Sequence, residues 1–186
     1  PDITRFASDK VNEDYKMWLL IRAGVEAGMD GDAATTVAFQ NTNLSVRMTA
    51  EDFEAVKNGG KIKQFSVSTG EQTGEIDARE LLKRISFGSW RIGDPAIQYE
   101  SVIQDMHTCK NSGKINSSNP CSEYMFLDNS SCNLASLNVF KFSDKHGNLD
   151  VEGFVKAAKR IQTALDIANH TASYPVDDIA KYSPEF

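Results

Sequence analysis

The stretch "TTVAFQNTNLSVRMTAEDFEAVKNGGKIKQFSVS", residues 35–68, predicts a strand region, a helix and another strand in succession. Its β-branched and partly alternating start, 35–48, favours one strand or two. Thr49 is placed to cap a helix that Gly59 closes, and alternation returns in 61–68. Because strands separated by helices are typical of α/β proteins, the stretch indicates an α/β fold.

The rest of the chain continues this mixture of helices and strands. The patterning predicts further helices at 4–27, 78–90, 96–107 and 151–173, and further strands at 74–76 and 132–142. In the helix at 78–90, the period places Leu81, Leu82, Ile85 and Trp90 on the buried side. Asp150 is expected to cap the last long helix.

Composition limits the classes of function. The chain has 186 residues, 40% of them hydrophobic and 25% charged, as expected for a soluble globular protein with a core. A net charge of −6 argues against an extended nucleic-acid-binding face. No apolar run approaches the roughly 20 residues of a membrane span, and the first residues do not read as a signal peptide. The three cysteines fit no secreted disulfide framework, so we expect a cytoplasmic protein.

The stretch "NSSNPCSEYMFLDNSSCNLASLN", residues 116–138, holds two of the three cysteines. Read simply, "NPCSE" is a turn with a small buried cysteine. A chemical reading is also open, because a proline stiffens the backbone before Cys121. If the loop doubles back, Asn119, Cys121 and Glu123 can point to one side and present an amide, a thiol and a carboxylate to one substrate.

Other functions remain open on the residues alone. A thiol-nucleophile hydrolase would pair Cys121 with His107, although nothing in the spacing ensures that they meet. A non-catalytic binding domain would bury its cysteines for packing. A metal site is disfavoured, since Cys109, Cys121 and Cys132 form no CxxC pair.

The cysteine stretch resembles the active-site segment of the ribonucleotide reductase large chain. "NPCSEY" is similar to the adenosylcobalamin-dependent, class II branch, with the metal-cofactor class I branch as the alternative. Four more stretches resemble the same family in the same order: "PDITRF" (1–6), "VAFQNTNLSVRM" (37–48), "GDP" (93–95) and "YPVDDIA" (174–180). The resemblance implies that 1–186 is a single segment of a longer catalytic chain. That segment would belong to a ten-stranded α/β barrel with a finger loop carrying the active-site cysteine.

The resemblance also implies roles for individual residues. Cys121 would carry the thiyl radical that removes the 3′ hydrogen of a ribonucleotide, Glu123 would take the 3′ hydroxyl proton, and Asn119 would bind the substrate hydroxyls. Pro120 and Ser122 would shape the loop, and the backbone of 119–123 would line the substrate. The implied reaction reduces ribonucleotides to deoxyribonucleotides for DNA synthesis.

Cys132 resembles the second member of the family's redox-active pair, whose partner lies outside this chain. The implied cofactor is adenosylcobalamin, and the implied reductant is a dithiol protein of the thioredoxin type. An allosteric nucleotide would bind the full chain, which could be a homodimer. Cys109 has no role to transfer and is expected to be structural. The isolated segment is expected to be inactive.

Overall fold

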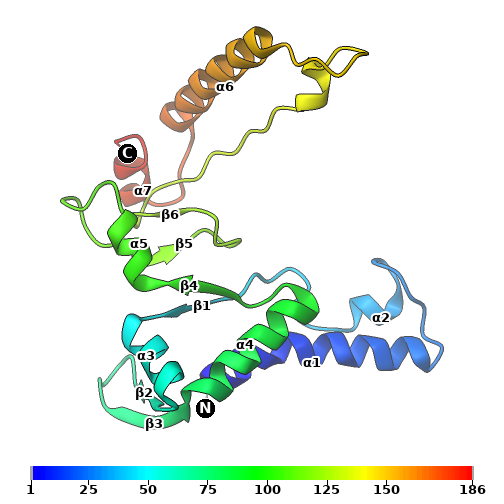
Figure 1. Cartoon of the computed structure of the whole chain (residues 1–186), viewed down its shortest axis with the longest axis vertical. Coiled ribbons are helices and arrows are strands. Elements are labelled where there is room, and N and C mark those ends of the chain that lie inside the picture. The colour runs from blue at the N-terminus through cyan, green and yellow to red at the C-terminus, as the bar shows by residue number, and fades with distance from the viewer. Residues whose placement is uncertain (1, 186) are drawn as a thin grey trace. The chain divides into compact units, whose positions relative to one another are not determined.

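The computed structural model describes residues 2–185, a mixture of helices and short strands in two compact units. Figure 1 shows the order of the elements along the chain. The first unit ends at Met125 and contains α1 (Asp2–Arg22), α2 (Asp32–Thr35), β1 (Ser45–Met48), α3 (Ala50–Asn58), β2 (Lys61–Phe65), β3 (Gln72–Asp77), α4 (Ala78–Ile92), β4 (Ala96–Tyr99), α5 (Glu100–Met106) and β5 (Ser117–Ser118). At the boundary lies β6 (Met125–Phe126), and the second unit contains the 3-10 helix η1 (Val139–Phe142), α6 (Val151–Thr171) and α7 (Asp177–Tyr182).

The strands pair in twos. β1 and β4 are parallel, β2 and β3 are antiparallel, and β5 pairs with β6. Among residues 2–185 these pairs do not close into a barrel. The expected mixture of helix and strand is therefore present, while the closed barrel is not part of this chain.

Local capping explains why α3 forms where the sequence predicts it. The Asp52 amide donates to Thr49 Oγ1 at 3.2 Å, and the Thr49 amide donates to Asp52 Oδ2 at 2.8 Å, which is a capping box. At the other end Gly59 takes a left-handed conformation, with φ of 68°. That conformation costs glycine little, so the helix ends there.

Two predictions around β1 and β4 are confirmed only in part. The strand expected over 35–48 is restricted to Ser45–Met48, and the helix expected over 96–107 begins only at Glu100. The residues before it, Ala96–Tyr99, form β4 and pair with β1 in parallel. A partner strand far away in the sequence decides this conformation, and such pairing overrides a weak local helical period.

The core of the first unit lies between β1, α1 and α4. Its buried cluster consists of Ala7, Val46, Met48, Leu81 and Ile85. The predicted inward positions Leu81 and Ile85 are confirmed at 3% and 1% exposure. Trp90 was placed with them wrongly, because its side chain is 78% exposed.

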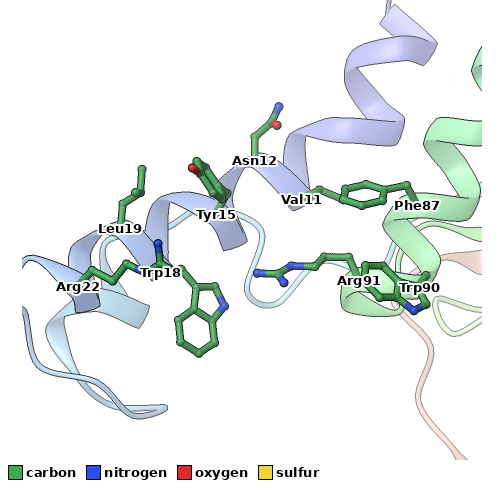
Figure 2. A pocket seen from close by; sticks show the side chains of 9 residues that line it. All are labelled: Val11, Asn12, Tyr15, Trp18, Leu19, Arg22, Phe87, Trp90 and Arg91. Carbon is green, nitrogen blue, oxygen red and sulfur yellow. The ribbon is translucent and has the colours of Figure 1, made fainter.

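Trp90 instead lines an open groove between α1 and α4. Figure 2 shows Trp18 and Tyr15 projecting from α1, and Phe87 and Trp90 projecting from α4. The rings of Phe87 and Trp90 lie 5.9 Å apart between centroids. None of the predicted site residues lines this groove.

A charged cluster supports the end of β4. Arg47 Nη1 donates to Glu100 Oε2 at 3.1 Å and to the carbonyl of Ile115 at 2.8 Å, and Lys114 Nζ lies 2.8 Å from Glu100 Oε1. The Glu100 side chain is 18% exposed. The hydrogen bond from Lys114, with the charges of Lys114 and Arg47, holds the pKa of Glu100 below its ordinary value of 4.5 despite partial desolvation.

In the second unit, Asp150 caps α6 as predicted, accepting from the Gly153 amide at 2.9 Å. The strand predicted over 132–142 is wrong: the segment has no regular structure before η1. Within residues 2–185 no strand pairs with it, and alternation alone does not stabilise a strand without a partner. Phe142 packs edge-on against Phe154 of α6, with ring centroids 5.4 Å apart.

We expect Gly88→Ala to destabilise the first unit. A Cβ at Gly88 would lie 2.5 Å from the backbone oxygen of Asp94 and 3.1 Å from Pro95 Cδ. The overpacking should cost about 1–3 kcal/mol, which exceeds the gain of about 1 kcal/mol from helix propensity. Urea denaturation measures the change. The exposed Ser86→Ala in the same helix is the control, and a Gly88→Ala protein as stable as the parent would contradict the packing argument.

Glu100→Gln should lower the free energy of unfolding at about pH 7 by on the order of 1–2 kcal/mol, because it removes the charge shared with Arg47 and Lys114. A carboxylate with a depressed pKa stabilises the fold above its ordinary value of 4.5. That contribution is lost as the pH falls through the lower pKa of the folded state. The difference between parent and variant, measured by denaturation across pH, should therefore be constant near neutrality and shrink in acid. A difference that grows in acid would refute this.

Candidate active site

The segment around Cys121 is a tight hairpin turn between β5 and β6. The Ser122 amide donates to the Asn119 carbonyl at 3.0 Å, and the Asn119 amide donates to the Tyr124 carbonyl at 3.1 Å. Asn119 Oδ1 accepts from the Tyr124 amide at 2.8 Å, which closes the base of the turn. Pro120 stands at the second position of this turn, where its fixed φ is favoured. The expected doubling back of the chain is therefore present, and residues 119–124 contain no helix.

Ser122 takes an uncommon backbone conformation in this turn. Its φ is 64°, in the left-handed region that costs a non-glycine residue about 1–2 kcal/mol. Its side-chain oxygen accepts a hydrogen bond from Gln98 Nε2 at 2.9 Å. This bond helps to offset the strain and ties the turn to β4.

The thiol of Cys121 lies at the tip of the turn and is exposed, as is Glu123. Asn43 Nδ2 lies 3.5 Å from Cys121 Sγ, within the range of an N–H···S hydrogen bond. A cysteine kept only for packing would be buried, so the exposure of Cys121 does not fit that reading. That Asn119, Cys121 and Glu123 act together on one substrate stays a prediction.

Sequence reasoning missed two residues near this turn, Asn43 and Gln98. Asn43 lies in the stretch predicted as one strand or two, and Gln98 lies inside the helix predicted over 96–107. Asn43 is 78 positions from its partner Cys121 in the sequence, and Gln98 is 24 positions from its partner Ser122. The only available signal was the polar character of Gln98 between apolar neighbours in "AIQY".

His107 does not serve Cys121 as a base. It is 7% exposed, its Nε2 pairs with the Gly113 carbonyl at 3.1 Å, and its Nδ1 accepts from the Cys109 amide at 3.3 Å. Both ring nitrogens are therefore used by the 107–113 loop. This geometry removes support for a thiol hydrolase built on His107.

Cys132 belongs to the second unit and is an exposed free thiol. Its neighbour Ser131 donates to Asn169 Oδ1 at 2.7 Å and hydrogen-bonds Ser183, which is 2% exposed. Tyr174 also donates to Asn169 Oδ1, at 2.6 Å. These bonds fix the backbone beside Cys132 against the end of α6. Cys109 is half-buried, and no observation gives it a chemical role.

Within residues 2–185, no group of three or more His, Cys, Asp or Glu side chains is arranged to hold a metal ion. Over the same residues we find no helix with the length and hydropathy needed to span a lipid bilayer.

Comparison with known proteins gives consistent relatives. Residues 1–185 match the family model described as "Ribonucleotide reductase, barrel domain". The "Vitamin B12-dependent ribonucleotide reductase" of Streptomyces coelicolor is 44% identical over 190 residues, covering 100% of this chain and 20% of the relative. The protein of the same name from Rhodopirellula baltica is 43% identical over 189 residues. This alignment covers 100% of this chain and 18% of the relative.

A more distant relative is the "Vitamin B12-dependent ribonucleoside-diphosphate reductase" of Thermoplasma acidophilum, 29% identical over 141 residues. That alignment covers 76% of this chain and 18% of the relative. The chain thus spans about a fifth of the length of these curated relatives. Since the family model covers nearly every residue, the chain belongs to the ribonucleotide reductase barrel-domain family.

Proposed function

We propose that this chain is part of the catalytic chain of an adenosylcobalamin-dependent ribonucleotide reductase, which converts ribonucleotides to deoxyribonucleotides for DNA synthesis. The observation that carries the proposal is the turn at 119–124, which presents an exposed thiol between an amide and a carboxylate. Membership of the family supports it. The names of the relatives favour cobalamin over a metal-cofactor radical source.

The proposed chemistry divides among three side chains. A thiyl radical on Cys121 takes the 3′ hydrogen atom of the substrate, so that an S–H bond forms, a C–H bond breaks and the radical passes to the ribose. Glu123 accepts the proton of the 3′ hydroxyl, which needs a carboxylate within hydrogen-bond reach. Asn119 Nδ2 would donate to the substrate hydroxyls, while the Asn119 backbone and Oδ1 keep the turn closed.

The residues of the turn fit an external radical source. Cys121 Sγ is exposed at the tip, so a hydrogen atom can leave it toward a bound cofactor without opening the core. Adenosylcobalamin, when bound, would supply the radical chemistry that no side chain starts alone. Pro120 and the Ser122 anchor would keep the thiol in one place while the remaining chain encloses the site against water.

Cys132 would supply reducing equivalents. Together with a second cysteine from outside this chain, its thiol would be oxidised to a disulfide, and the pair would give up two electrons and two protons. The 2′ hydroxyl leaves as water, and hydrogen takes its place on the 2′ carbon. A thioredoxin-type dithiol would then reduce the disulfide by thiol exchange. The exposure of Cys132 supports access by such a reductant.

We further propose that 1–186 forms one segment of the family's ten-stranded catalytic barrel, with the hairpin between β5 and β6 as its finger loop. The parallel pairing of β1 with β4 is the kind that such a barrel requires. None of the residues of α6 is buried, although the helix has an apolar face, so further chain could cover it. The full protein would be cytoplasmic, could form a homodimer and would bind an allosteric nucleotide.

Cys121→Ser in the full-length protein carrying this segment should abolish deoxynucleotide formation, by more than about a thousand-fold, and leave folding intact. The reason is that an O–H bond is too strong for balanced exchange of a hydrogen atom with carbon. Deoxynucleotide is measured after incubation with adenosylcobalamin, ribonucleotide and a dithiol. Cys109→Ser is the matched control and should stay active, while measurable turnover by Cys121→Ser would remove the radical assignment.

Cys132→Ser should separate hydrogen abstraction from reduction. The variant should lose sustained turnover with a dithiol, since a redox cysteine is consumed in each cycle. It should keep exchange of the substrate's 3′ hydrogen, which needs only the regenerated thiol of Cys121. Exchange is measured with 3′-labelled nucleotide beside a turnover assay, and sustained turnover of Cys132→Ser would contradict the redox role.

A further inference from the structure

We propose that Gln98 is a positioning residue that fixes the Cys121 turn by holding the chain on both sides of it. Its side chain is 4% exposed and donates to Ser118 Oγ at 2.8 Å and to Ser122 Oγ at 2.9 Å. One serine precedes Cys121 and the other follows it. The consequence for catalysis rests on the proposed reductase function, whereas the structural role does not.

The orientation of the Gln98 amide is fixed by chemistry. Arg47 Nε lies 3.0 Å from Gln98 Oε1, and an arginine can only donate, so the oxygen of the amide must face it. The amide nitrogen therefore faces the serine hydroxyls. A third hydroxyl, that of Ser45 at 3.1 Å, shares the two available hydrogens. All groups of the Gln98 amide are thus satisfied in a buried place, where leaving them unpaired is costly.

The direction of these hydrogen bonds also shows how Ser118 and Ser122 connect Gln98 to the turn. Ser118 Oγ already donates to the Asn119 carbonyl at 2.8 Å, so it accepts from Gln98. A continuous chain of donors then runs from Arg47 through Gln98 and Ser118 to the first residue of the turn. Ser122, which closes the four-residue turn by donating its amide to the Asn119 carbonyl, accepts directly from Gln98.

Strand pairing and hydrogen bonds support Gln98. Gln98 and Arg47 are register partners on the parallel strands β4 and β1, and Arg47 is held in turn by Glu100 and the Ile115 carbonyl. The turn is thus fastened to a strand pair next to the core. Reacting atoms must be placed to within about 0.5 Å, so a loose turn would reduce the rate of hydrogen transfer more than substrate affinity.

Gln98→Met tests the proposal, because methionine keeps the length and approximate volume and removes the hydrogen bonds. Gln104→Met is the matched control. Gln104 donates to the Ile115 carbonyl at 2.7 Å and to Glu100 at 3.2 Å, so it holds the neighbouring loop and makes no bond to the turn.

The first measurement is amide hydrogen exchange in the full-length protein. Gln98→Met should speed exchange of the Ser122 and Tyr124 amides by about ten-fold or more and leave Ile115 unchanged. Gln104→Met should instead speed exchange of the Ile115 amide and leave the Ser122 and Tyr124 amides unchanged. Unchanged protection of the turn in Gln98→Met would overturn the inference, whether or not the protein proves to be a reductase.

The second measurement is steady-state reduction of ribonucleotide. Gln98→Met should lower kcat by about 10–100-fold with KM within about three-fold, while Gln104→Met keeps kcat. Adding Ser118→Ala to Gln98→Met should cause little further loss, because Gln98→Met already breaks the link that runs from Gln98 through Ser118 to the Asn119 carbonyl. The inference would be overturned if the losses in kcat from the two substitutions multiply in the double variant. It would also be overturned if Gln98→Met alone has a kcat within about two-fold of the parent. A parent that makes no deoxynucleotide would refute the proposed function instead, and the exchange data would then decide the role of Gln98.

Discussion

The hydrogen bond from Arg47 to Gln98 joins the two strands on which the rest of the first unit depends. It links β1, whose Val46 and Met48 enter the core, to β4, which leads directly into α5. Because the two side chains are partners in a parallel register, backbone pairing places them together without a further loop or helix. The same bond satisfies the acceptor of a buried amide and leaves its donors for the cysteine turn.

In this arrangement apolar and polar contacts have different roles. The apolar cluster around Ile85 stabilises the sheet and helix contact but has no directional preference. The polar groups from Glu100 to Ser122 specify direction, because hydrogen bonds form only where a donor faces an acceptor. Stability and orientation of the turn therefore come from different sets of residues.

Sequence reasoning succeeded where the signal is local. Thr49, Gly59 and Asp150 are caps that act within a few residues, and each marks a helix end in the structure. It failed where a distant partner decides. Ala96–Tyr99 is a strand only because β1 lies beside it, and 132–142 lacks such a partner within the described chain. The turn at Pro120 could be read from its own residues, whereas the contacts of Asn43 and Gln98 with it depend on tertiary packing.

The backbone of Ser122 limits which residues that position can accept. Glycine would relieve the left-handed φ of 64° but would supply no oxygen for Gln98. Alanine or threonine would keep the strain, and a β-branched side chain tolerates it worst. Asparagine and aspartate tolerate the conformation, yet each is longer than serine in a space already shared with Ser118 at 3.5 Å. Serine therefore meets two requirements at position 122 together: a side-chain oxygen short enough to accept from Gln98, and a backbone held at a positive φ.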